Sequence, residues 1–85
     1  MIAVLSQDKT ILCEPIMLQV SIYPNGYGLY EVLGFVAGKP TGIPLGAYLT
    51  PARAAMVVRA YEAFEVVNPA ERKCNVFEMP QKEEV

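Results

Sequence analysis

The chain has 85 residues, of which 53% are hydrophobic and 19% are charged. This length allows one domain with one core, and the high hydrophobic fraction excludes an intrinsically disordered chain. The net charge of −2 and the acidic end at Glu83 and Glu84 exclude the basic surface that binds duplex nucleic acid or anionic membranes. We expect one domain over residues 1–80 and a flexible acidic tail over residues 81–85.

The sequence also excludes several kinds of segment and site. No apolar run approaches the roughly 20 residues of a membrane helix, and residues 1–5 are too few for a signal peptide. A cytoplasmic protein is therefore expected. The chain has no histidine, and Cys13 and Cys74 are far apart, which excludes zinc-type spacing and histidine-dependent catalysis. We interpret both cysteines as packed thiols and expect no metal and no other cofactor.

The first part of the chain has the pattern of β-hairpins. Residues 1–5 are apolar, Ser6–Lys9 form a polar turn, and an extended pattern restarts at Ile11. From residue 16 the chain alternates between apolar and polar positions, which is typical of a half-buried strand. The face predicted to contact a helix consists of Ile16, Leu18, Val20 and Ile22.

A second hairpin follows, because Pro24-Asn25-Gly26 is a strong turn signal. Residues 29–37 are rich in strand-forming side chains, residues 38–44 form a loop of Gly, Pro and Thr, and residues 45–49 predict a short strand. Together these segments predict an antiparallel meander.

One helix is predicted after the meander. Thr50 is a favourable N-cap and Pro51 suits the first helical position, whereas Asn68-Pro69 ends the pattern. Residues 73–79 predict an edge strand. The predicted fold class is α+β, with a meander of four to five strands packed on one C-terminal helix over about residues 51–67.

Charges are sparse in the predicted sheet. Between Thr10 and Thr50 the charged residues are Glu14, Glu31 and Lys39. A small domain with so few charges exposes apolar surface, and such surface usually marks an interface. We therefore expect a homo-oligomer.

Several residues are candidates for binding a ligand. Arg53 falls on the apolar face of the predicted helix, in its first turn, where a cation beside free N–H groups suits an anion. The alternative is that its stem covers the core and its head reaches solvent. Tyr23, Tyr30 and Tyr48 are expected on the sheet face away from the helix, where they suit a subunit interface or a stacked base.

Paired carboxylates are available only in exposed settings. Glu62 and Glu65 share an exposed helix face, and Glu83 and Glu84 lie in the tail. Neither setting raises a pKa as general acid catalysis requires, so we expect no enzymatic activity.

Three short motifs resemble a known family. The opening MIAVLSQDK, the LGAYLT before the helix with ARA at residues 52–54, and the closing VFEMP are similar to small proteins of phages, prophages and their Gram-positive hosts. The resemblance spans the chain, although the central hairpin differs from the shorter family version. It implies a phage-type accessory protein of meander-plus-helix build.

Two functions are compatible with these features. By analogy with phage sponges, the first is sequestration of a nucleotide immune signal, of the cyclic ADP-ribose or cyclic dinucleotide type, without cleavage. The alternative is a protein-interaction module that inhibits or bridges a host or phage protein through its apolar sheet face or a free edge at residues 1–5. Convergence of the cations in a cleft favours the first, and their dispersal favours the second. The predicted ligand-binding residues are Arg53, Lys9, Arg59, Tyr48, Tyr30 and Tyr23.

Overall fold

The computed structural model describes residues 2–66 and 75–85. It contains one α-helix and two three-stranded sheets, which confirms the predicted α+β class. The strands are β1 (Ala3–Leu5), β2 (Leu12–Cys13), β3 (Met17–Val20), β4 (Tyr30–Phe35), β5 (Ile43–Tyr48) and β6 (Val76–Glu78). The helix α1 covers Pro51–Val66, and a 3-10 helix covers Lys82–Glu84.

The first sheet, which we call the mixed sheet, has the order β2-β1-β6. β1 is antiparallel to β2 and parallel to β6. The prediction of a single meander is therefore wrong for these strands. Buried Pro15 separates β2 from β3, and proline has no N–H for a ladder, so the chain leaves one sheet there and enters the other. Because β1 is the central strand, the free edge predicted at residues 1–5 is also wrong, whereas β6 is an edge strand as predicted.

The second sheet, the meander sheet, has the order β3-β4-β5 with antiparallel neighbours. The register of β4 against β5 shifts between Val32 and Leu33, so that buried Leu45 is an extra residue in β5. Leu45 lies over Gly34, where an added Cβ would come within 2.6 Å of the Leu45 Cδ1 atom. Glycine is therefore needed at this position for the bulge to pack.

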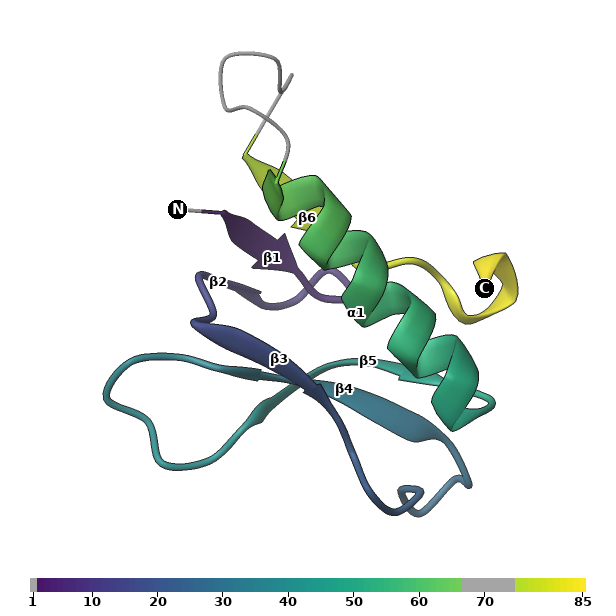
Figure 1. Ribbon diagram of the computed structural model, residues 1–85. Coiled ribbons are helices and arrows are strands. Elements are labelled where there is room, and N and C mark those ends of the chain that lie inside the picture. Colours follow the sequence, from purple (N-terminus) through teal and green to yellow (C-terminus); the bar gives the residue numbers. More distant parts are fainter. Residues whose placement is uncertain (1, 67–74) are drawn as a thin grey trace.

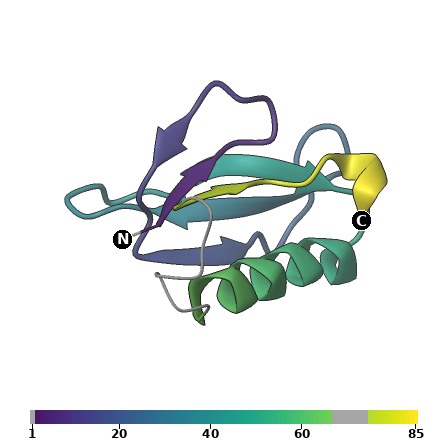
Figure 2. The same cartoon turned by 90° about the horizontal axis from the view of Figure 1, so that it is seen from above.

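The two sheets are stacked. In Figure 1 the mixed sheet lies above the meander sheet with α1 in front, and Figure 2 shows α1 running alongside β3 while β1 and β6 lie over β4 and β5. The core lies between these three layers and consists of Ile2, Val4, Val32, Leu45, Tyr48, Ala54, Val57, Tyr61, Phe77 and Met79. Below the meander sheet in Figure 1 there are only hairpin loops.

The start of α1 agrees with the sequence. The Arg53 N–H donates to the Thr50 Oγ1 atom at 3.1 Å, which confirms Thr50 as the N-cap. The buried helix positions are Ala54, Val57 and Tyr61. Arg53 is exposed, so its predicted place on the apolar face is wrong. The predicted stop at residues 68–69 and Cys74 lie outside the described residues.

The structure differs from two further expectations. Leu18 and Val20 pack against the core as predicted, but Ile16 and Ile22 lie beyond the ends of β3 and are 68% and 78% exposed. Residues 81–85, expected as a flexible tail, contain the 3-10 helix, and Val85 packs against the core.

Candidate functional site

The turn after β1 is built around a buried hydroxyl group. Ser6 is 2% exposed, and its Oγ atom donates to the Asp8 Oδ1 atom at 2.7 Å. The same Oγ atom accepts hydrogen bonds from the N–H groups of Thr10 and Ile11. Lys9 adopts a positive φ of 64°, which an L-residue rarely adopts outside a tight turn. The polar residues of this motif therefore determine the shape of the hairpin.

Gln7 joins this turn to two distant segments. Its Oε1 atom accepts a hydrogen bond from the Ala47 N–H at 3.1 Å, and its Nε2 atom donates to the carbonyl oxygens of Ala47 and Pro80 at 3.2 Å each. The Gln7 N–H also donates to the Leu45 carbonyl at 2.7 Å. The three motifs that carry the family resemblance thus meet at Gln7, and we call this place the motif junction.

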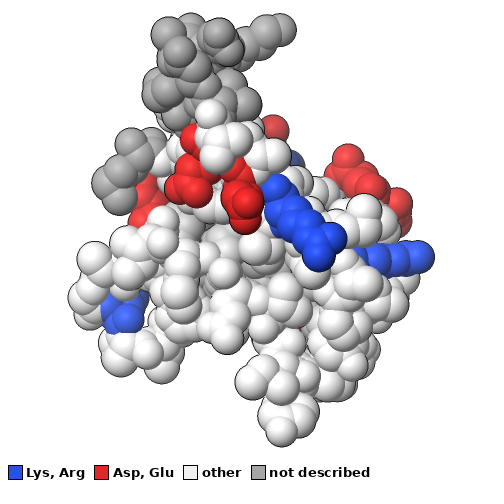
Figure 3. Space-filling view, in the orientation of Figure 1, with Lys and Arg blue, Asp and Glu red and all other residues white. Residues whose placement is uncertain are grey.

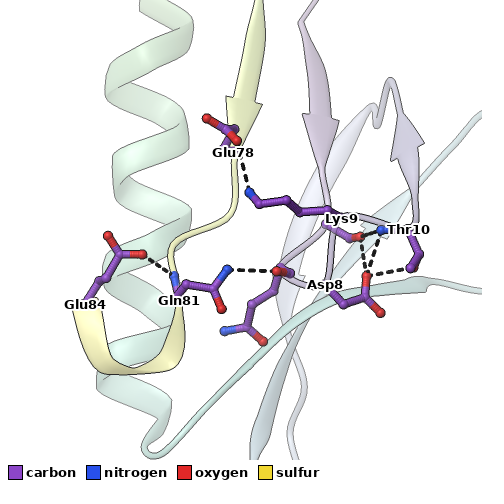
Figure 4. Close-up of polar contacts among 8 residues, drawn as sticks. Asp8, Lys9, Thr10, Glu78, Gln81 and Glu84 are labelled. Carbon is purple, nitrogen blue, oxygen red and sulfur yellow. Dashed lines mark hydrogen bonds and ion pairs between the residues drawn. The ribbon is translucent and has the colours of Figure 1, made fainter.

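The C-terminal segment closes the motif junction. The Gln81 Nε2 atom donates to the Gln7 carbonyl at 2.8 Å, and the Gln81 N–H donates to the Glu84 Oε1 atom at 2.7 Å. Lys9 and Glu78 form an exposed ion pair with an N–O distance of 3.1 Å. Figure 4 shows these contacts linking the turn to β6 and to the segment after it. The described contacts of the motif junction stabilise the fold, because each polar side chain is bonded within the chain.

The turn at the motif junction also contains a carboxyl group, that of Asp8. Hydrogen bonds from the Thr10 and Ser6 hydroxyl groups, with the Thr10 N–H, lower the pKa of its carboxyl group to about 2. The carboxylate is therefore ionised at physiological pH and serves as a hydrogen-bond acceptor. A group with this pKa is a poor general base.

The predicted tyrosines do not share one face. Tyr48 is fully buried, and its hydroxyl group donates to the Pro80 carbonyl at 2.8 Å, so its predicted place on the outer face is wrong. Burial, with a contribution from the charge of Glu84, raises the pKa of Tyr48 to about 12. Tyr30 pairs with Tyr48 across β4 and β5 and packs against the core, so it also faces inward. Tyr23 is 79% exposed and lies in the loop after β3.

The predicted cations are dispersed. Lys9 is paired with Glu78 and lines a hollow of about 330 Å³ beside Pro80 and Gln81. Arg53 and Arg59 are exposed on α1. Tyr23 lines a different hollow, of about 310 Å³, with Gln19, Ser21 and Leu33. Within one chain the structure does not gather the six predicted residues into one site.

The outer face of the meander sheet is a surface that the sequence pattern did not resolve. The register places one set of side chains on the side away from the core, and we define the outer face by these residues: Met17, Gln19, Glu31, Leu33, Phe35, Pro44 and Ala47. Met17 is 50% exposed, and Leu33 and Phe35 are half-buried. Exposed Ile22, Tyr23 and Tyr27 extend the apolar surface into the β3–β4 loop.

This surface carries few charges. Residues 15–50 include one acid, Glu31, and one base, Lys39. In Figure 3 the charged side chains gather over the upper part and the right-hand side of the molecule, whereas the lower part is white apart from a blue area at the left. An apolar sheet face of this kind is the surface that proteins normally cover with another layer.

Metal-binding clusters and membrane-spanning helices are absent from residues 2–66 and 75–85. Among them no three Cys, Asp or Glu side chains are grouped in a way that could hold a metal ion. In the same residues no helix has the length and apolar character to cross a membrane. Cys13 is a free, half-buried thiol, and its burial raises its pKa.

The chain was compared with family models, curated proteins and solved structures, and none of them matches it. The resemblance to the phage family therefore stays a hypothesis that rests on the three motifs.

Proposed function

We propose that this protein is a non-catalytic protein-interaction module whose binding surface is the outer face of the meander sheet. The observation that supports this proposal is a three-stranded sheet face that carries few charges and that no layer of the described residues covers, whereas the opposite face of the same sheet packs into the core. Burial of apolar surface drives most protein association, at roughly 25 cal/mol per Å².

The chemistry of the face specifies the kind of partner. Leu33, Phe35 and Met17 provide apolar contact area, and Gln19 provides hydrogen-bonding groups among them. A flat apolar surface, such as another sheet face, matches this pattern better than a charged groove or nucleic acid. The dispersal of the predicted cations favours this function over nucleotide binding within one chain.

Photo-crosslinking tests the proposal. Phe35 is replaced by a photoreactive phenylalanine analogue, and the matched control carries the analogue at Ala63, which is exposed on α1. We expect specific protein adducts from position 35 that disappear when Leu33→Asp is added, and none from position 63. Equal adducts from both positions, or none from position 35, would refute the proposed binding surface.

Sequestration of a nucleotide signal is a second candidate function. In the described part of the chain the one ion pair is Lys9–Glu78, so the guanidinium groups of Arg53 and Arg59 are free to bind an anion. Arg53 lies in the first turn of α1, where the helix dipole also favours negative charge. A complete nucleotide site then requires residues from a second chain.

Isothermal titration calorimetry with cyclic dinucleotides and cyclic ADP-ribose isomers tests this second candidate. We expect heat of binding that is lost in Arg53→Ala and retained in Lys82→Ala, a control with an exposed cation elsewhere. Absence of heat with every ligand, or equal binding by both variants, would contradict it.

A further inference from the structure

The occupant of the outer face can be argued from the charges at its two ends. Asp8 lines the same hollow as Glu31 and Pro44, so the acidic end holds two carboxylates. Glu31 lies at the start of β4 and points to the outer face, because its neighbours Tyr30 and Val32 point to the core. Lys39 is exposed in the β4–β5 loop, beyond the other end of β4. The only acid and the only base of residues 15–50 therefore lie at opposite ends of one strand.

We propose that the outer face binds a second copy of this chain, sheet against sheet, with the two β4 strands antiparallel. A two-fold axis that crosses the strand direction midway between Glu31 and Lys39 then places Glu31 of each copy opposite Lys39 of the other, so that two equivalent ion pairs flank an apolar centre. This inference rests on the proposed function and names its partner.

The charge pattern selects this arrangement over the other two-fold stacking. With the two β4 strands parallel, Glu31 would face the same residue of the second copy, and so would Lys39. Like charges placed opposite each other across an interface oppose association. An isologous interface must be complementary to itself, and the antiparallel arrangement meets this condition.

The composition of the face fits a second copy. Met17, Leu33 and Phe35 would form the dry centre, at the spacing of about 10 Å that is typical of stacked sheets. The loop after β3, with Ile22 and Tyr23, lies at the Glu31 end of β4, so it would meet the β4–β5 loop of the second copy. In Figure 1 both hairpin loops extend below the sheet, toward the side that the second copy would occupy.

Charge reversal tests the inference. The mass of the full-length protein in solution is measured by sedimentation equilibrium over a range of concentrations for the wild type, Glu31→Lys, Lys39→Glu and the double variant. We expect a dimer for the wild type, a dissociation constant roughly ten to a hundred times higher for each single variant, and recovery in the double variant. An equimolar mixture of the two single variants should form a mixed dimer that is tighter than the dimer of either variant alone. In the mixed dimer position 31 of each copy faces an opposite charge at position 39 of the other, whereas both contacts in each single-variant dimer join like charges.

The control is Glu62→Lys on the exposed face of α1, which leaves the dissociation constant unchanged. Circular dichroism verifies that each variant is folded. A wild type that is monomeric at every concentration, or a dimer that the double variant does not restore, overturns the inference. If position 35 still crosslinks to another protein when the wild type is monomeric, only the identity of the partner is wrong. If it crosslinks to nothing, the proposed function fails as well.

Discussion

The two faces of the meander sheet are made by the same three strands and yet have opposite surroundings. On the inner face Val32, Leu45 and Tyr48 are covered by the mixed sheet and α1, and each is at most 2% exposed. On the outer face Met17 and Leu33 have no layer against them in the described chain. Apolar character alone therefore does not show which residues form the core of a small domain, because an interface has the same composition.

The largest expected effect is the difference in the free energy of unfolding between truncating a leucine on the inner face and truncating one on the outer face. Leu45→Ala should lower the free energy of unfolding by about 2 to 5 kcal/mol, because it leaves a cavity in the core. Leu33→Ala should lower it by about 1 kcal/mol or less at protein concentrations too low for association. Urea unfolding followed by circular dichroism measures both. Equal losses would show that the two faces are buried to the same extent.

A pair of glutamines extends the comparison to polar residues. Gln7→Ala removes the side chain that bonds Ala47 and Pro80 at the motif junction, so we expect a loss of about 1 to 3 kcal/mol in the free energy of unfolding. Gln19→Ala on the outer face is the matched control and should change it by about 0.5 kcal/mol or less. The structural role assigned to the motif junction is wrong if Gln7→Ala is as stable as the control.

The buried hydroxyl group of Tyr48, on the inner face, should make the stability of the protein depend on pH. Its pKa is about 12 in the folded protein against 10.0 for an unperturbed tyrosine. The unfolded chain therefore releases this proton first, so the stabilisation is complete below pH 10 and is lost as the pH rises toward 12.

Tyr48→Phe should remove this part of the alkaline dependence and cost about 1 kcal/mol at neutral pH through the lost bond to Pro80. Unfolding at neutral and alkaline pH measures both effects. The control Tyr23→Phe, at an exposed position, should leave neutral stability unchanged. An unaltered alkaline curve for Tyr48→Phe would contradict the assignment.

The smallest expected effect concerns Asp8. Its pKa is lowered from 3.8 to about 2, with the Thr10 hydroxyl group as the largest cause. The stabilisation from this carboxylate is therefore present above pH 3.8 and is lost as the pH falls toward 2. Thr10→Val should raise the pKa of Asp8 part of the way back, as measured by NMR titration. Thr41→Val in the β4–β5 loop should not change it, and a pKa that stays near 2 in Thr10→Val would refute the cause.

Local signals in the sequence predicted the local structure well. The polar turn at residues 6–9, the strands of the meander sheet and the helix start at Thr50 all follow from short-range rules, and the structure has each of them. The parallel pairing of β1 with β6 has no local signal, because it joins Ala3 to Val76 across nearly the whole sequence.

The orientation of side chains was harder to predict, for two physical reasons. The bulge at Leu45 makes both Leu45 and Gly46 face inward, which reverses the alternation along β5 and turns Tyr48 into the core. In β4, apolar residues occupy both faces, so alternation could not show that Tyr30 faces inward. Because these two tyrosines face inward, they do not lie with the predicted cations on one surface of the chain.

The parallel pair of β1 and β6 also affects how the chain folds during synthesis. Residues 76–78 are made long after residues 3–5, so until they leave the ribosome β1 has only the short β2 beside it. The hairpins of the meander sheet are close in sequence and can form earlier, since contacts between nearby residues form faster. A nascent chain would therefore expose both faces of the meander sheet for a time, and the mixed sheet would close over it last.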